Sequence, residues 1–469
     1  MTEGIIEAGH EPGLSRVETV MTAIERRIEG RAMTAGTRLP SVRAFADTMQ
    51  VSKSTVVEAY DRLLAQGSIV SRPGSGFYVA AKAQPLSLAS IGPRLDREVD
   101  PLWIARQSLE ATAEMLVPGC GWMPEAWMPE ESIRRALRQV ARDREVNLTR
   151  YDTPLGYTPL RQQLARRLTE RGILAHPEQI VLTDSATAAL DLICRFLAEP
   201  GDTVLVDDPC YFNFHALLRA YRFKVVGVPF GVGGPDLAAF EQALKEHKPR
   251  FYLTNSGLHN PTGASLTPAV VHRVLRLAEA HDTVIVEDDI YADFEVEPGP
   301  RLAGFDGLDR VVHIGGFSKT LSAAARIGVI AIRSDWIERL VDLKLAVSVG
   351  SGHLNAVLVH RLLTDGGYRH HLETMRNRLA DMRGTTLKRL ATAGLGVPYV
   401  PLAGMFLWAC LPDGLDAAEI SRRALRRGVV LAPGNVFSLG QNAADHLRFN
   451  VAQCADKRVF DVLAEAMEG

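Results

Sequence analysis

The residue with the clearest capacity for covalent chemistry is Lys319. It lies in Val311-Val-His-Ile-Gly-Gly-Phe-Ser-Lys-Thr320, a buried-type strand that ends in two glycines and delivers the lysine to the strand's carboxyl end. A lysine in a partly desolvated site has a lowered pKa and can form a Schiff base with an aldehyde. Arg326 follows seven residues later, before the apolar run Ile327–Ile332, and suits a phosphate. Because a lone loop lysine is usually a solvated charge, this interpretation depends on its neighbours.

Acidic residues follow a second buried-type strand, in Val284-Ile-Val-Glu-Asp-Asp-Ile-Tyr291. Ligands of open α/β sheets bind outside the carboxyl ends of the strands, where Asp288 and Asp289 fall. Side chains alternate faces along a strand, so only one of the two can point into a given cleft. A helix cap or a solvated loop would explain these acids equally well in isolation.

Small residues at a strand-to-helix junction form a third candidate. Ile180-Val-Leu-Thr183 predicts a strand, and Asp184-Ser-Ala-Thr-Ala-Ala-Leu190 opens a helix. Backbone N–H groups at a helix N-terminus attract anions, so the sequence favours a phosphate at Ser185, Ala186 and Thr187. Many α/β proteins have such turns merely for packing.

Together with Asn260-Pro-Thr-Gly263 and Leu447-Arg-Phe-Asn450, these motifs stand in the order found in a known family. From about residue 100 to 469 the chain resembles fold-type I pyridoxal 5′-phosphate (PLP) dependent enzymes of aminotransferase class I/II. The resemblance implies an α/β fold, with a large parallel or mixed sheet domain and a smaller C-terminal α+β domain.

The resemblance also implies a role for each motif residue. Lys319 would hold PLP as an internal aldimine, and Asp288 would keep the pyridine nitrogen protonated, which strengthens the ring as an electron sink. Arg448 would clamp a substrate or effector carboxylate in a bidentate fork. The other contacts to PLP would be Asn260 and Tyr291 at the phenolic oxygen, Tyr211 stacked on the ring, and Ser185, Ala186, Thr187, Ser318 and Arg326 around the phosphate.

Two points of the family pattern stay open. Three positions before the lysine these proteins usually place a hydroxyl on the phosphate, but this chain has Gly316. Losing a charge-assisted hydrogen bond costs ~1.5–3 kcal/mol, so weaker PLP retention is expected. Either Tyr151 or Tyr157 would reach the phosphate of a neighbouring subunit.

The N-terminal zone predicts three helices followed by a β-hairpin. Ser41 is a predicted N-cap, a short turn lies at Gln50-Val51, and Ser52 opens the next helix, which Gly67 ends. Two helices with so tight a turn form a helix-turn-helix unit, whose second helix enters the DNA major groove by its N-terminal end. Ile69–Val79 predicts a wing around a Pro-Gly-Ser-Gly turn, with Arg72 near its tip.

The same pattern also fits a small helical cap or a dimerisation module. What favours DNA is the set of hydrogen-bond donors, which resembles the winged helix of the GntR family over the whole zone. The segments that carry this resemblance are Arg38-Leu-Pro-Ser-Val-Arg43, Val51-Ser-Lys-Ser-Thr-Val56 and Gly74-Ser-Gly-Phe-Tyr-Val79. The residues expected on double-stranded DNA are Arg38, Ser41, Arg43, Lys53, Ser54, Thr55, Arg72 and Gly76.

Composition sets the limits of these interpretations. The length of 469 residues and the mass of 51.3 kDa predict two or three domains. The expected parts are a winged helix at 14–79, a linker at 80–105 and a PLP-binding body at 106–469, with its small subdomain from about 345. The formal net charge of -2 excludes a uniformly basic surface but not a local basic face. The five cysteines are scattered and predict free thiols in a reducing cytoplasm. Neither a signal peptide nor a membrane span is expected, which also favours the cytoplasm.

A GntR-like head on an aminotransferase-like body is the plan of the MocR subfamily of regulators, which the sequence resembles over nearly its full length. The resemblance implies a homodimer that binds DNA and senses PLP or an amino compound. An aminotransferase with an incidental head is the main alternative, because the residues for transamination are present and a fold does not prove turnover. A PLP carrier without DNA contact is a third, weaker hypothesis.

Overall fold

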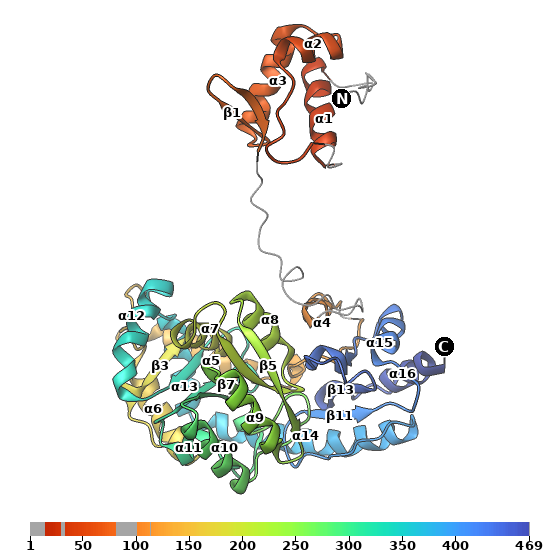
Figure 1. The fold of residues 1–469 in the computed structure, drawn as a ribbon. Coiled ribbons are helices and arrows are strands. Elements are labelled where there is room, and N and C mark those ends of the chain that lie inside the picture. The colour runs from red at the N-terminus through yellow and green to blue at the C-terminus, as the bar shows by residue number, and fades with distance from the viewer. Residues whose placement is uncertain (1–14, 30–32, 81–100, 113, 469) are drawn as a thin grey trace. The chain divides into compact units, whose positions relative to one another are not determined.

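The computed structural model describes residues 15–29, 33–80, 101–112 and 114–468. The chain divides into two compact units, residues 1–87 and 88–469, drawn in Figure 1. Most of the expected linker, residues 81–100, lies outside the described residues. Its last five residues were assigned wrongly, because helix α4 occupies Pro101–Leu109. Proline suits the first position of a helix, where its missing N–H leaves no bond unmade.

The first unit is a three-helix bundle with a hairpin. It consists of α1 (Arg16–Glu29), α2 (Val42–Met49), α3 (Lys53–Ala65), β1 (Ile69–Arg72) and β2 (Gly76–Val79). The predicted N-caps are confirmed, since Ser41 accepts from the N–H of Ala44 and Ser52 accepts from the N–H of Thr55. Buried Tyr60 donates its hydroxyl to the carbonyl of Pro40, at 2.9 Å, and so fixes α3 against the chain that enters α2.

The second unit is built on a mixed sheet of eight strands, in the order β3-β10-β9-β8-β7-β4-β5-β6. Strands β9, β8, β7, β4 and β5 are parallel, and β10 is antiparallel to both of its neighbours, which makes β3 parallel to the central strands. The carboxyl ends of β3, β4, β7, β8 and β9 therefore meet at one edge. The strands are β3 (Ile180–Thr183), β4 (Thr203–Asp208), β5 (Lys224–Gly231), β6 (Gly234–Pro235), β7 (Phe251–Thr254), β8 (Val284–Asp288), β9 (Val311–Gly316) and β10 (Gly328–Ala331).

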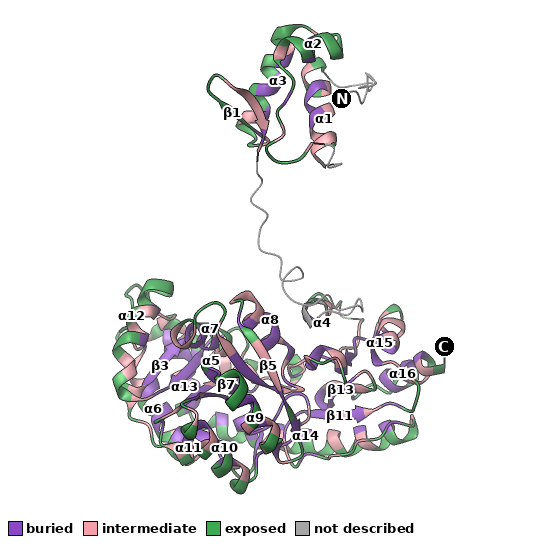
Figure 2. Cartoon of the chain, in the orientation of Figure 1, coloured by how far each residue is buried: buried purple, intermediate pink, exposed green. Residues whose placement is uncertain are grey.

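Helices cover both faces of this sheet, and Figure 2 shows the buried residues that line its strands. Alternate residues of one strand enter opposite cores: Leu182 belongs to one apolar cluster and Val181 to the other. The first cluster is closed by α5 (Glu130–Arg142), α6 (Thr158–Thr169), α9 (Leu237–His247), α10 (Pro268–Ala280), α11 (Leu302–Asp306) and α13 (His353–Thr364). The second is closed by α7 (Ala186–Leu197), α8 (Phe212–Ala220) and α12 (Ile337–Ser348).

The C-terminal lobe has its own core around the sheet β11-β13-β12. It consists of α14 (Gly367–Thr392), β11 (Phe406–Cys410), α15 (Ala417–Arg426), β12 (Ala432–Pro433), β13 (His446–Asn450) and α16 (Arg458–Glu468). The predicted start near residue 345 is wrong. Helix α13 and the first turns of α14, through Leu372, bury their apolar side chains in the core of the large domain, and Met375 is the first residue of α14 that belongs to the core of the lobe.

Two further expectations concern cysteines and membranes. All five cysteines are free thiols, as predicted. No helix in the described part of the chain combines the length and apolar content that crossing a membrane requires.

Candidate functional site

A cavity of about 560 Å³ opens at the carboxyl edge of the large sheet. It brings together predicted residues from four separate strand ends, because β3, β4, β8 and β9 run in the same direction. The predicted residues that line it are Ser185, Ala186, Thr187, Tyr211, Asp288, Ser318, Lys319 and Arg326. Asn260, Tyr291 and Arg448 do not line it, and form a buried layer described below.

Lys319 lies in the turn after β9 and faces the cavity. Burial lowers the pKa of its amine to about 8, and the positive charge of Arg448 acts in the same direction. Cys120 and Asp288 partly oppose this shift of the pKa. A useful fraction of the amine is therefore unprotonated near neutral pH, which is the form that attacks a carbonyl.

Asp288 ends β8 and is 7% exposed. Burial raises the pKa of its carboxyl to about 6, while hydrogen bonding from Asn255 and from the N–H of Ile290 opposes the rise. The N–H of Ile290 lies 3.3 Å from Oδ1. The carboxyl is thus an anion at neutral pH in a desolvated place, where it would favour a positively charged partner.

The N-terminus of α7 and Arg326 form the anion-binding end of the cavity. The hydroxyl of Ser185 caps α7 by accepting from the N–H of Ala188 at 2.9 Å. Because Ala186 and Thr187 are the first residues of the helix, their N–H groups have no acceptor within it. Arg326 is exposed and lines the cavity, without a hydrogen bond or ion pair to any residue that the structure describes. Two N–H donors, a helix N-terminus and a free cation suit a phosphate.

Asn260, Tyr291 and Arg448 are linked to one another beneath the cavity. The Asn260 amide donates to the Tyr291 hydroxyl at 3.2 Å and accepts from Arg448 at 2.7 Å. The other terminal nitrogen of Arg448 donates to the carbonyl of Gly119 at 2.6 Å, and its Nε has no partner among the described residues. The fork expected to clamp a carboxylate is therefore occupied by two protein oxygens in this structure, which leaves Nε as its free donor.

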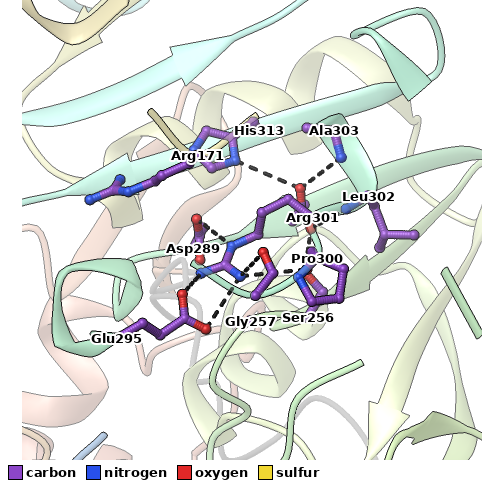
Figure 3. Close-up of polar contacts among 12 residues, drawn as sticks. Arg171, Ser256, Gly257, Asp289, Glu295, Pro300, Arg301, Leu302, Ala303 and His313 are labelled. Carbon is purple, nitrogen blue, oxygen red and sulfur yellow. Dashed lines mark hydrogen bonds and ion pairs between the residues drawn. The ribbon is translucent and has the colours of Figure 1, made fainter. Parts of the chain in front are cut away.

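Sequence reasoning missed a buried charged network around Asp289, the residue that follows the end of β8 (Figure 3). Asp289 points away from the cavity and pairs with Arg301 at 2.8 Å, and Arg301 also pairs with Glu295 at 2.5 Å. On the other side Glu287 accepts from the backbone N–H groups of Leu302 and Ala303, at 2.8 and 3.0 Å. As predicted, only one of the two neighbouring aspartates faces the cavity.

Gly316 lies at the end of β9 and does not line the cavity. A Cβ there would lie 3.3 Å from the carbonyl oxygen of Ile327 and 3.5 Å from the Cβ of Ala186. A larger residue would therefore require its neighbours to move by a few tenths of an ångström. The surroundings of Gly316 are thus tightly packed. Because glycine has no side chain, nothing from residue 316 extends toward the N-terminus of α7.

The two candidate tyrosines have different surroundings. Tyr157 is half-buried, with its ring edge-on to the rings of His353 and His360 at 5.3 and 5.7 Å. Tyr151 is 86% exposed. Tyr151 is thus the more exposed of the two side chains.

In the first unit, the predicted DNA contacts gather at the start of α3 and on the hairpin. Lys53 is exposed, while Ser54 and Thr55 share hydrogen bonds with the Ser52 hydroxyl, at 2.8 and 2.7 Å. Arg72 ends β1 and lies over the ring of Tyr78, at 4.5 Å.

The remaining predicted contacts lie on the adjoining segments. Arg38 is exposed and pairs in a β-bridge with Tyr78. Its side chain lies next to Gly76, since a Cβ built at Gly76 would be 3.6 Å from the Nε of Arg38. Arg43 is exposed on α2, and Ser41 is exposed although its hydroxyl caps that helix.

Comparison with known families agrees with this geometry. Residues 125–466 match the family described as aminotransferase class I and II. The chain belongs to this family. Residues 16–79, the winged helix, match the bacterial regulatory proteins of the gntR family.

Relatives include both regulators and enzymes. YdcR, an uncharacterized HTH-type transcriptional regulator of Escherichia coli, is 32% identical over 94% of this chain and 95% of its own length. A 2-aminoadipate transaminase of Thermus thermophilus is 33% identical over 70% of this chain and 83% of its own length. Among solved structures, one similar protein is LysN of Thermus thermophilus, an alpha-aminoadipate aminotransferase complexed with N-(5′-phosphopyridoxyl)-L-leucine. It is 28% identical to this chain, and the TM-score is 0.71 over 79% of this chain and 95% of that chain.

Proposed function

We propose that this protein is a PLP-dependent transcription regulator, in which the winged helix binds double-stranded DNA and the body senses PLP or an amino compound. The observation that carries the proposal is the cavity that joins Lys319, Asp288 and Arg326 at one sheet edge, in a chain that also has a gntR-type head. The regulator YdcR supports it, because its similarity spans head and body together.

The cavity's residues fit PLP at each end. When bound, PLP supplies an aldehyde and an electron-withdrawing ring. Lys319 would hold it covalently, Asp288 would pair with the ring nitrogen, and Tyr211 would stack on the ring. Asn260 and Tyr291 would serve the phenolic oxygen. The phosphate would be held by Ser185, Ala186, Thr187, Ser318 and Arg326.

The amino compound would be held by its carboxylate at Arg448. Because both terminal nitrogens of Arg448 are engaged, a carboxylate would bind at the free Nε or displace the carbonyl of Gly119. A ligand shifts a conformational equilibrium only by its different affinity for the two states. Arg448 is a group whose hydrogen bonds would differ between the empty and the occupied protein.

We further propose a homodimer in which Tyr151 of one subunit reaches the phosphate of the other. The segment that carries Tyr151 is fixed to the start of α13, since Asp152 bonds His353 at 2.8 Å. Apolar side chains are exposed on this surface, notably Leu148, Val349 and Leu354, and a second copy would cover them. Two heads would then contact two half-sites.

On DNA, the proposed contacts are those of the head alone. Lys53, Ser54 and Thr55 would enter the major groove, and Arg72 and Gly76 of the wing, with Arg38, Ser41 and Arg43, would contact the backbone. Bacterial regulators of the gntR type bind chromosomal DNA, which lies in the cytoplasm. The protein would therefore act in the cytoplasm.

The competing function is transamination, which the relative described as 2-aminoadipate transaminase favours. A mixed case, a regulator with slow turnover, is compatible with the same residues. The body's geometry does not distinguish these functions, whereas the exposed donors at the start of α3 would be without purpose in an enzyme. The regulator is therefore the better-supported function.

The test is to incubate the full-length protein with fragments of its own genome and sequence those retained, with and without PLP and a set of amino acids. We expect a few sites with paired half-sites, and an occupancy that the added compounds alter. Fragments retained at random, together with rapid multiple turnover of amino donors, would establish the enzyme instead.

A further inference from the structure

A second group of side chains with the types needed for covalent chemistry lies in the C-terminal lobe, on the strands β11 and β13 (Figure 1). The two strands are antiparallel, and Cys410 stands directly opposite His446 in their register. Opposite residues of a sheet share a face, and here the Sγ of Cys410 lies 3.1 Å from the Nε2 of His446. The Nδ1 of His446 lies 2.7 Å from the carboxylate of Asp445. A thiol, an imidazole and a carboxylate are thus joined in one chain of hydrogen bonds, and none of them lines the cavity of the large domain.

The carboxylate decides which nitrogen of His446 can act as a base. An ionised carboxylate only accepts hydrogen bonds, so the Nδ1 of His446 carries a hydrogen and donates it to Asp445. In the neutral ring the Nε2 then has a free lone pair, which faces the thiol of Cys410. His446 is therefore placed to take the proton of Cys410. A nucleophile, a base and a group that orients the base together form the pattern of an activated nucleophile.

Cys410 is also the most accessible thiol of the chain. It is half-buried, whereas the other four cysteines are at most 2% exposed. The reactivity of a cysteine follows its access to solvent and its supply of thiolate. Burial and the charge of Asp445 raise the pKa of Cys410, so little thiolate forms at neutral pH unless a neighbouring base takes the proton. Any unusual reactivity of Cys410 therefore depends on His446.

A cysteine–histidine pair in the large domain has the same first contact without a usable base. The Sγ of Cys210 lies 3.0 Å from the Nε2 of His215. Both side chains are buried, and burial lowers the pKa of His215 to about 3, so its ring does not retain a proton at neutral pH. Cys210 thus lacks both the access and the base that Cys410 has, and it provides a control within the same molecule.

We propose that Cys410 is a modification site, a thiol that His446 activates toward hydroperoxides. The sulfur attacks one peroxide oxygen while the thiol proton passes to the Nε2 of His446, so an S–O bond forms and the O–O bond breaks. The electron pair of the broken bond leaves with the second oxygen, which takes the proton from His446 and departs as water or an alcohol. The sulfur is oxidised by two electrons, the peroxide is reduced by two, and Cys410 becomes a sulfenic acid.

Hydroperoxides are the class of reagent that this position suits. A half-buried thiol admits a small electrophile, and the protonated His446 supplies the proton that the leaving oxygen needs. The inference concerns a site outside the ligand cavity, and it stands or falls independently of the proposed function.

The first test finds where hydrogen peroxide acts. The full-length protein, freed of reductant, is exposed to hydrogen peroxide in the presence of dimedone, which captures sulfenic acids, and the adducts are located by mass spectrometry of its peptides. We expect the adduct on Cys410 to exceed that on Cys210 and on each of the other cysteines by roughly tenfold or more. No adduct on Cys410, or equal adducts on Cys410 and Cys210, would overturn the proposal.

The second test separates an activating base from a histidine that merely covers the thiol. The measured quantity is the rate constant for oxidation of Cys410 by hydrogen peroxide at neutral pH. His446→Phe removes the base and keeps a ring against Trp408, whose ring lies 5.0 Å from that of His446. We expect the rate to fall by roughly tenfold or more, because a general base contributes a factor of this size or larger. A rate that is unchanged or that rises would show that His446 only shields Cys410.

Asp445→Asn tests the third group by the sign of its effect. If Asp445 acted on Cys410 through its charge alone, its removal would lower the pKa of the thiol and speed the oxidation. If Asp445 holds His446 in the active tautomer, its removal slows the oxidation, and we expect a loss of roughly threefold or more. An unchanged or faster rate would overturn the assigned role. Circular dichroism confirms that each variant is folded, and His446→Gln replaces His446→Phe if the latter does not fold.

Discussion

The winged head and the cavity of the body place their polar groups in opposite ways. On the head, Lys53, Arg43 and Arg72 are exposed, and their positions follow from helix caps and a hairpin within a short stretch of chain. In the body, Asp288 and Arg448 are buried, and Arg448 bonds to Gly119, 329 residues away. Exposed groups can therefore act one by one, whereas buried groups depend on a complete set of partners.

The largest effect that this difference predicts is at Lys319. Lys319→Ala should abolish covalent retention of PLP, because Lys319 is the one lysine that lines the cavity among the described residues. The absorbance band of the bound PLP, near the visible edge, should disappear or shift. DNA binding by the head in the absence of PLP should remain. The matched control is Lys344→Met, since burial also lowers the pKa of Lys344 to about 8.

Lys344 does not line the cavity, and its amine donates to the carbonyl of Pro154 at 2.6 Å. Its replacement should lower stability by ~1–3 kcal/mol and leave the PLP band intact. A PLP band that survives in Lys319→Ala, or disappears in a folded Lys344→Met, would contradict the assignment of Lys319.

The second effect concerns the buried ion pairs of the body. Arg301→Met should destabilise the body by about 3–5 kcal/mol, because it leaves Asp289 and Glu295 buried without their shared cation. An exposed pair is the control: Arg134→Met, which removes the contact with Glu130, should cost ~0.5 kcal/mol or less. Urea unfolding followed through body tryptophans would measure both, and equal midpoints would refute the dependence on partners.

These contrasts explain how far the sequence alone could go. Strand-end motifs located Lys319, Asp288 and Arg326 correctly at one edge, because a parallel sheet brings the ends of its strands together. The occupied fork of Arg448 could not be foreseen, because it depends on the distant carbonyl of Gly119.

Other parts of the structure escaped sequence reasoning for similar reasons. Ser108 is an ordinary serine in sequence, and only the folded chain shows that it lies in the wall of the cavity with its hydroxyl buried and unpaired among the described residues. The start of the C-terminal lobe was misplaced because α13 has the same apolar pattern whichever core it joins. A local pattern shows that a face is buried, but not which core buries it.

A third effect is the pH dependence of PLP capture by the PLP-free protein. The pKa of Lys319 is lowered to about 8, so its neutral fraction rises roughly tenfold per pH unit below 8 and levels off above it. The rate of absorbance change on mixing with PLP should follow this curve. An ordinary exposed lysine would continue to gain reactivity up to about pH 10.4. A rate that still rises steeply between pH 9 and 10 would show that burial does not lower the pKa of Lys319.

The smallest effect belongs to the head. Lys53→Ala should weaken DNA binding at every site by a similar factor and lower the slope of log affinity against log salt by about 0.9, the value for one phosphate contact. Arg62→Ala is the control within the same helix, because Arg62 is exposed near the C-terminal end of α3 and pairs with Glu58 at 2.6 Å. Both variants should keep the wild-type stability and the PLP band, since neither side chain is buried. An identical loss of affinity in the two variants would mean that only net charge matters, and that the N-terminal end of α3 is not the part that meets the duplex.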